Sequence, residues 1–141
     1  MSAQDWAAQA LQSFDTVVQS TTGFRGRPGQ RRMAEQVAHA FSLAQLGKVD
    51  EDDDNAAPPQ RAIAVVQAGT GVGKSLAYSV PAIAMALARG TRVLISTATV
   101  ALQEQLVNKD LPALAALMPQ PFKFALAKGR GRYVCKLKLD R

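Results

Sequence analysis

A short glycine-rich stretch carries the clearest chemistry in the sequence. Residues 68–75 read Ala-Gly-Thr-Gly-Val-Gly-Lys-Ser, which matches the phosphate-loop pattern G-x-x-x-x-G-K-[ST] except that Ala68 stands first. In such a loop, successive backbone N–H groups turn inward around phosphate oxygens, and glycines leave room for them. The Lys74 ammonium then reaches the β- and γ-phosphates, and the Ser75 hydroxyl binds Mg²⁺. The stretch therefore predicts a site for ATP with Mg²⁺.

The residues of this loop are the candidates for the nucleotide site. Lys74 is the candidate catalytic residue, and Ser75 is the candidate Mg²⁺ ligand. The expected nucleotide contacts are Gly69, Thr70, Gly71, Val72, Gly73, Lys74 and Ser75. The alternative is a glycine-rich turn in front of a helix. Average residue usage puts a chance match in a chain of this length at a probability on the order of 1%, which favours the nucleotide site.

The segments that flank the loop have the pattern that a phosphate loop requires. Residues 62–67 are a short apolar, β-branched run, typical of a strand buried on both faces of a parallel sheet. A helix is expected from about Gly73 to Ala88, stopped by Gly90. We expect two further strands at 92–97 and 122–129, and helical segments at 98–112 and 111–119. This order predicts an α/β fold with a parallel sheet.

Two amphipathic helices are expected before the loop, at residues 3–19 and from about Gly29 to Leu46. Their apolar stripes are Trp6, Ala10, Phe14 and Val17 in the first, and Met33, Val37, Phe41 and Ala44 in the second. The chain then divides into N-terminal helices at 1–46, an acidic loop at 47–61, a nucleotide-binding part at 62–127 and a basic tail at 128–141. The acidic run Asp50 to Asp54 lacks the alternating ligand spacing of a calcium loop, so we interpret it as a solvated surface loop.

A second stretch, residues 24–34, contains groups suited to reading a base. A Gln side chain can pair with both the N6 donor and the N7 acceptor of adenine, and an aromatic ring or an Arg can stack on the base. Gln30, with Phe24 and Arg27 nearby, fits that task. The alternative interpretation is a polar Gln at the start of a helix.

A third stretch follows the predicted strand at 92–97. Small hydroxyl residues there, among them Thr97 and Thr99, leave the strand at the carboxyl edge of the sheet, where α/β proteins bind ligands. Hydroxyl groups and backbone N–H groups are suited to holding a phosphodiester backbone. Taken alone, the same pattern is that of a capped helix start.

Together these stretches resemble the first motor domain of superfamily-two helicases, and most closely the DinG-type, XPD-like iron–sulfur DNA helicases. RPGQ resembles their adenine-reading Q motif, AGTGVGKS their nucleotide loop, and STATVALQEQLVNKDLP their first DNA-contacting motif. KGRGRYVC at 128–135 resembles the segment that leads to their first cluster-ligating Cys, although Arg132 stands where an Asn is often seen. The resemblance covers about residues 14–141.

The resemblance implies a partial RecA-like P-loop domain preceded by a helical Q-motif segment. It also implies an ATP-dependent helicase that moves 5′→3′ on single-stranded DNA, unwinds duplexes and acts in DNA repair or replication. Thr97, Thr99 and Gln103 are the implied DNA contacts. Residues 128–141 are the implied, truncated start of the iron–sulfur cluster region, and Cys135 is an implied cluster ligand in a complete parent protein only. The family's acidic Mg²⁺ motif, its other three Cys ligands and its second motor domain do not occur in these residues. The fragment is therefore expected to bind nucleotide without hydrolysing it.

The charge distribution and the apolar runs of the sequence limit the classes of protein to which it can belong. The net charge of +6 lies in the tail, because residues 121–141 hold seven basic residues and one acid, whereas residues 1–120 are balanced. A basic tail suits a polyanion, and the alternative is a solvated terminus. The apolar run at 76–88 is too short to span a bilayer. The expected protein is a cytoplasmic, nucleoid-associated monomer that binds single-stranded and forked DNA. A different P-loop enzyme and a non-catalytic binding module are the competing hypotheses.

Overall fold

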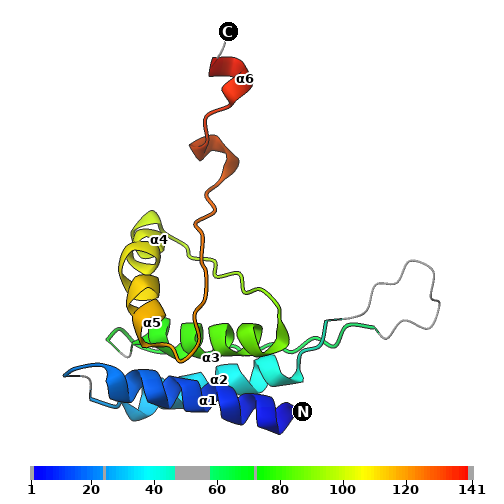
Figure 1. Ribbon diagram of the computed structural model, residues 1–141, viewed down its shortest axis with the longest axis vertical. Coiled ribbons are helices and arrows are strands. Elements are labelled where there is room, and N and C mark those ends of the chain that lie inside the picture. The colour runs from blue at the N-terminus through cyan, green and yellow to red at the C-terminus, as the bar shows by residue number, and fades with distance from the viewer. Residues whose placement is uncertain (1, 24, 47–57, 72, 140–141) are drawn as a thin grey trace.

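The computed structural model describes residues 2–23, 25–46, 58–71 and 73–139, and within them the regular elements are all helical. In chain order they are α1 (Ala3–Ser20), α2 (Pro28–Leu43), α3 (Lys74–Arg89), α4 (Val100–Gln105), the π-helical turn η1 (Leu106–Asp110), α5 (Leu111–Leu117), the 3₁₀ turn η2 (Arg130–Arg132) and α6 (Lys136–Leu139). Helices α1, α2 and α3 pack side by side, and α4, η1 and α5 follow one another as one rod (Figure 1).

Helix α1 forms where its sequence pattern predicts it. Ser2 caps the helix by accepting a hydrogen bond from the Asp5 N–H, and the Asp5 carboxylate accepts one from the Ser2 N–H, which makes a capping box. Ala10, Phe14 and Val17 are buried, as the predicted stripe requires, and Trp6 is half-buried. The first predicted helix is therefore confirmed, together with most of its buried face.

Helix α2 is also present, and it buries part of the predicted stripe: Val37 is buried and Met33 packs against the core. Phe41 of the predicted stripe is 40% exposed, whereas Ala34 and Ala38 are buried. The small alanines allow α2 to approach α1 and α3 closely, and that contact decides which face is covered. The helix ends at Leu43 rather than near Leu46, because the chain becomes extended at Ala44 and Gln45 pairs with Gln60.

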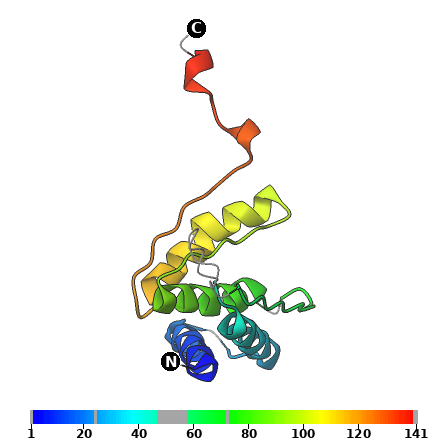
Figure 2. The same ribbon diagram turned by 90° about the vertical axis from the view of Figure 1, so that its right-hand side faces the viewer.

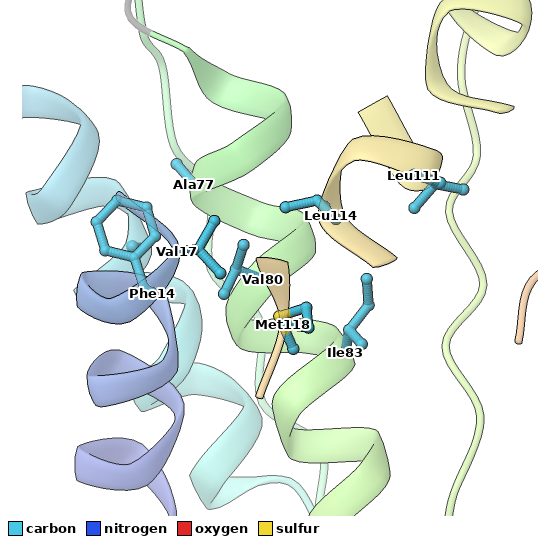
Figure 3. Packing of buried hydrophobic residues seen from close by; sticks show 9 residues of the cluster. Phe14, Val17, Ala77, Val80, Ile83, Leu111, Leu114 and Met118 are labelled. Atoms are coloured by element: carbon cyan, nitrogen blue, oxygen red, sulfur yellow. The ribbon is translucent and has the colours of Figure 1, made fainter. Parts of the chain in front are cut away.

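One hydrophobic core joins the packed helices to the end of the α4–α5 rod (Figure 3). Its buried members are Phe14 and Val17 of α1, Ala34 of α2, Ala77, Val80 and Ile83 of α3, and Leu111, Leu114 and Met118 around α5. A smaller cluster of Ala10, Ala38 and Met85 continues the same packing between α1, α2 and α3. Helices α1, α2 and α3 each supply residues to both clusters, and α3 supplies the most.

The predicted parallel sheet is not formed among the residues that the structure describes. Residues 62–67, 92–97 and 122–129 run without strand pairing, and no backbone hydrogen bond between described residues joins the first two of these segments to a neighbour. Several of their apolar side chains are open to solvent: Ile63 is 86%, Val65 94% and Leu94 89% exposed, whereas Phe122 packs against the core. An extended segment becomes a strand only when neighbours take up its N–H and C=O groups and cover its faces, and these segments lack such neighbours here.

The acidic loop is closed at its base by a two-residue bridge. Gln45 N–H donates to the Gln60 carbonyl at 2.9 Å, and Gln60 N–H donates to the Gln45 carbonyl at 3.0 Å. The predicted acidic run at residues 50–54 lies outside the described residues. Across the described part of the chain, none of the helices is both long and apolar enough to cross a membrane.

The C-terminal part of the chain leaves the helical body as an arm (Figure 2). From Met118 it runs past the α4–α5 rod and carries the two short turns η2 and α6 at its outer end. All of its described residues from Ala127 onward are exposed. The division at about residue 128 that the sequence predicts lies within this arm, and it remains a proposal as a domain boundary.

Candidate nucleotide-binding site

The glycine-rich loop runs directly into the N-terminus of α3. Gly71 and Gly73 both have φ of +81°, a left-handed conformation that side chains disfavour, and Gly73 is the residue that precedes the first turn of α3. Gly69 and Thr70 are exposed, and a Cβ added at Gly69 or Gly71 would meet no atom within 4 Å. The loop thus presents open backbone at the end of a well-packed helix. Val72 lies outside the described residues.

Lys74 closes the loop on itself. Its Nζ atom donates a hydrogen bond to the Ala68 carbonyl at 3.0 Å, across the turn that the loop makes. Ser75 follows in the first turn of α3 and is half-buried. The geometry therefore places an ammonium group and a hydroxyl group together at the positive end of a helix dipole, where anions bind. Glycines at strained positions, an exposed loop backbone and these two side chains fit a triphosphate with Mg²⁺.

Gln30 is packed directly against the loop. Its side chain is 1% exposed, and its Nε2 atom donates to the Gly73 carbonyl at 3.0 Å. A Cβ at Gly73 would overlap the Gln30 amide, so the close approach of the two residues requires glycine there. Sequence reasoning placed Gln30 at the nucleotide site but did not foresee this contact with the loop backbone. Adenine reading by Gln30 remains a prediction.

The other two residues predicted beside the base are less well placed. Arg27 is exposed at the N-terminal end of α2, and none of its hydrogen bonds to described residues contacts the loop. Phe24 lies outside the described residues. The structure thus brings Gln30 to the loop and leaves the contribution of Arg27 and Phe24 as a prediction.

Arg89 is a residue that sequence reasoning missed. It lies at the end of α3, where its Nη1 atom donates to the carbonyls of Phe41 at 2.9 Å and Ala44 at 2.8 Å, and its Nη2 atom donates to the Ser42 carbonyl at 2.9 Å. Its guanidinium carbon also lies 5.2 Å from the centre of the Trp6 ring. Arg89 caps the C-terminal end of α2, and Gln30 contacts the loop at the N-terminal end, so α2 is attached to α3 at both ends.

The predicted DNA contacts lie at the start of α4. The Thr97 hydroxyl donates to the Thr99 carbonyl at 3.3 Å, and the Thr99 hydroxyl caps α4 by accepting from the Leu102 N–H at 3.2 Å. Gln103 Nε2 donates to the Ala127 carbonyl at 3.4 Å, so this side chain contacts the C-terminal arm. The structure brings Thr97, Thr99 and Gln103 together, and their role in binding DNA remains a prediction.

Cys135 is an exposed free thiol in the arm. An iron–sulfur cluster takes four thiolates, and the sequence contains one cysteine. Among the described residues, no group of three or more His, Cys, Asp or Glu side chains is placed to hold a metal ion. These residues therefore do not fit a cluster on their own.

Comparison with known proteins agrees with the geometry of the loop. A family model for the DEAD/DEAH box helicase matches residues 50–118, and this family implies a RecA-like P-loop fold. The chain is 59% identical over 76 residues to the ATP-dependent DNA helicase DinG of Photobacterium profundum, which covers 54% of this chain and 11% of that protein. It is 47% identical over 117 residues to the ATP-dependent helicase DinG of Mycobacterium tuberculosis, covering 80% of this chain and 15% of that protein.

A third relative, the ATP-dependent DNA helicase DinG of Escherichia coli, is 50% identical over 74 residues, which is 52% of this chain and 10% of that protein. The chain thus spans 15% or less of the length of these relatives. The family-model match includes the glycine-rich loop and helix α3 behind it, since both lie within residues 50–118. On these grounds, the chain is similar to part of the DinG-type helicases, over as much as 80% of its own residues.

Proposed function

We propose that this chain is the nucleotide-binding part of an ATP-dependent DNA helicase that moves 5′→3′ along single-stranded DNA and unwinds duplexes. The observation that carries the proposal is the open glycine loop at the start of α3, with Lys74 and Ser75 at its base and Gln30 packed against it. The relatives' names point to the same activity.

The mechanism of nucleotide binding follows from the loop. When a triphosphate enters, the Lys74 ammonium exchanges the Ala68 carbonyl for β- and γ-phosphate oxygens. The backbone N–H groups of the loop surround the same phosphates. If Mg²⁺ is bound there, the Ser75 hydroxyl would hold it, and it would supply positive charge to the phosphates. Lys74 thereby serves both binding and catalysis.

We further propose that the three extended segments are strands of the RecA-like sheet in the full-length protein, meaning the longer helicase that contains this chain. Two of them, residues 91–97 and 122–127, line a hollow of about 490 Å³ against α3 and η1 with mostly apolar side chains. Apolar, β-branched segments exposed in this way gain free energy when neighbouring strands cover them. In the same longer protein, Cys135 would be one of four cluster ligands if other segments supply three thiolates.

The proposal also covers the DNA substrates, the oligomeric state and the cellular location of the protein. Single-stranded and forked DNA are the proposed substrates, and the full-length protein is proposed to be a monomer in the cytoplasm, at the nucleoid. The fragment alone is proposed to bind nucleotide without turnover. Phosphoryl transfer in such motors needs a carboxylate for Mg²⁺ and water and an Arg from a second domain, which the family supplies elsewhere.

Phosphate release by the full-length protein tests this function. Single-stranded DNA should stimulate ATP hydrolysis, and Lys74→Ala should abolish it. Lys109→Ala, an exposed site on η1, serves as the control and should retain the activity. The 141-residue chain should show no turnover above background. If the 141-residue chain hydrolysed ATP near the ~1–10² s⁻¹ of phosphoryl-transfer enzymes, the proposal that hydrolysis needs other segments of the longer protein would be contradicted.

Base preference tests the role of Gln30. If Gln30 pairs with adenine, the full-length protein should prefer ATP to GTP by roughly 5- to 150-fold, because a buried acceptor facing guanine O6 costs about 1–3 kcal/mol. Gln30→Ala should remove much of this preference. Gln36→Ala, an exposed Gln on the same helix, should not change it. If the ATP-to-GTP affinity ratio is the same in Gln30→Ala and wild type, Gln30 does not read the base. Its role would then be its contact with Gly73.

A further inference from the structure

Helix α2 is attached to α3 by polar contacts at both of its ends. Near the N-terminus of α2, the Gln30 Nε2 atom donates to the Gly73 carbonyl, just before α3 begins. At its C-terminal end, α2 receives three hydrogen bonds from the Arg89 guanidinium of α3, on the carbonyls of Phe41, Ser42 and Ala44. The two helices therefore lie side by side and run in the same direction (Figure 1). One end of α2 lies at the nucleotide loop, and the other lies at Arg89.

The C-terminal end of α2 depends on this side chain of α3. The last four carbonyls of a helix have no partner within the helix, and the last turn of α2 contains no basic residue of its own. Arg89 takes up the carbonyls of Phe41 and Ser42 and places a positive charge at the negative end of the helix dipole. Among the described residues, no side chain caps the N-terminus of α2 in return. Its polar attachments to α3 are thus those made by Gln30 and Arg89.

Between these two ends, small side chains line the buried face of α2. Ala34, Ala38 and Ser42 follow Gln30 at every fourth position, and all of them are buried. Small side chains let two helices approach closely, but apolar contact has no direction and changes little when one helix slides along the other. Hydrogen bonds depend steeply on distance and angle. The contacts of Gln30 and Arg89 are therefore expected to set the position of α2 along α3.

The loop end of α2 leaves little room for displacement. The Gly73 carbonyl accepts hydrogen bonds from Gln30 Nε2 at 3.0 Å and from the Ala77 N–H at 3.2 Å. Gln30 lies so close to Gly73 that a Cβ there would overlap its amide. Lys74, whose ammonium is expected to reach the phosphates, is the next residue. A shift of Gln30 along α3 would therefore press on or release the backbone that presents Lys74.

We propose that Arg89 is a positioning residue for the nucleotide site. By holding the C-terminal end of α2, it keeps Gln30 against Gly73, and it thereby keeps the glycine loop in the conformation that accepts a triphosphate. The inference rests on the proposed nucleotide site and adds to it a residue at the opposite end of α3. Trp6, the single tryptophan of the sequence, has its ring centre 5.2 Å from the Arg89 guanidinium carbon, so its emission reports on this attachment.

A double-mutant cycle on nucleotide affinity tests the proposal. The probe is a ribose-labelled fluorescent ATP analogue with Mg²⁺, titrated into this chain at a temperature well below the unfolding transition of every variant. Arg89→Met should weaken binding by roughly 2- to 30-fold, the range of couplings that packed elements carry between distant residues. In the Gln30→Ala background, Arg89→Met should change the affinity by less than about twofold, because its effect passes through Gln30.

Two further variants and a second readout separate positioning from stability. Arg92→Met, an exposed site just beyond α3, should bind the analogue as tightly as wild type. Arg89→Lys retains a cation that can donate to some of the same carbonyls, so its affinity should lie between those of wild type and Arg89→Met. Because coupling between two sites is reciprocal, saturating ATP should change the emission of Trp6 in wild type, and Gln30→Ala should remove that change.

Three results would overturn the proposal and leave the proposed nucleotide site standing. If Arg89→Met binds the analogue as tightly as wild type, the attachment at the end of α2 does not affect the loop. If Arg89→Met weakens binding equally in the wild-type and Gln30→Ala backgrounds, Arg89 acts through the stability of the packed helices and not through Gln30. If ATP changes the emission of Trp6 equally with and without Gln30, the coupling follows another route. A wild-type chain that does not bind the analogue would instead contradict the proposed nucleotide site and this inference with it.

Discussion

The packed helices and the extended segments of this chain differ in how they satisfy their backbone. Helices α1, α2 and α3 make their hydrogen bonds internally and need only an apolar face to cover, which they find in one another. The segments at 62–67 and 92–97 leave their backbone unpaired between described residues and their apolar side chains exposed. The nucleotide loop lies where the two regions meet. The stability of the loop should therefore depend on the packed helices. The arrangement around the loop should be completed only when other strands pair with the extended segments.

The largest expected difference between the two regions is in the free energy of unfolding. Phe14 is 2% exposed in the core, so Phe14→Ala should lower the stability of the chain by about 3–5 kcal/mol. Ile63 is 86% exposed in an extended segment, so Ile63→Ala should change it by less than about 0.5 kcal/mol. Urea denaturation of both variants measures this. A cost at Ile63 that approaches the cost at Phe14 would mean that the segment is packed in solution.

A smaller effect is expected for the helix attachment at Arg89. Arg89→Met removes three hydrogen bonds to the C-terminal carbonyls of α2 and the contact with Trp6, and should cost about 1–3 kcal/mol. Arg92→Met, at an exposed position just beyond α3, is the matched control and should be near neutral. Thermal unfolding distinguishes them. Equal stability of the two variants would show that α2 is held by its apolar face alone.

At the junction itself, Gly73→Ala should cost about 1–2 kcal/mol, because alanine is strained at a φ of +81° and its Cβ would displace the Gln30 amide. Gly69→Ala, where a Cβ meets no atom within 4 Å, should leave the stability unchanged. In the Gln30→Ala background, Gly73→Ala should cost less than in wild type, because the overlap is gone and only the strain remains. Denaturation of Gly73→Ala, Gly69→Ala, Gln30→Ala and the double variant tests both contributions, and an equal cost of Gly73→Ala in both backgrounds would rule out the overlap.

The smallest expected effect is a dependence on pH at the start of α1. The hydrogen bond from the Ser2 side chain, followed by that from the Ser2 backbone N–H, holds the pKa of Asp5 below its ordinary value. A carboxyl group whose pKa is lower in the folded state stabilises that state above its unfolded pKa, and this contribution is lost as the pH falls through the folded pKa. The protection of the amides in the first turn of α1, measured as their exchange rate relative to the unfolded chain at the same pH, should therefore fall below about pH 4. In Asp5→Asn, this protection should already be lower at neutral pH and should not depend on the Asp5 titration.

The sequence predicted the helices well because their signals are local. The stripe of α1, the glycine loop and the stop at Gly90 each lie within a few residues of the element that they define. The buried face of α2 was predicted only in part: Val37 is buried as predicted, whereas the choice between Phe41 and Ala34 depends on how closely α3 approaches. The strands were predicted from composition, but pairing depends on partners that are not local. Arg89 gave no signal, because its acceptors are backbone carbonyls of another helix.

The sequence predicted the residues of the candidate site more fully than the contacts between them. The pattern of residues 68–75 identified the loop, and the resemblance placed Gln30 beside it. The bond from Gln30 to the Gly73 carbonyl, and the bond from Gln103 to Ala127, link residues through backbone atoms, which residue types do not reveal. The sequence predicted the basic tail only as a cluster of positive charge. The tail lies beside α4 because the chain runs back along α4, η1 and α5 after the end of α5.

Titration of a fluorescent ATP analogue with Mg²⁺ into this chain tests the central claim that the loop at α3 is a nucleotide site. Wild-type chain should bind the analogue saturably, and Lys74→Ala should not, because the ammonium that reaches the phosphates is gone. Both proteins should have the same far-ultraviolet circular dichroism, since the Lys74 side chain is exposed and bonds only the Ala68 carbonyl among described residues. Equal affinity of the wild-type chain and Lys74→Ala would contradict the account.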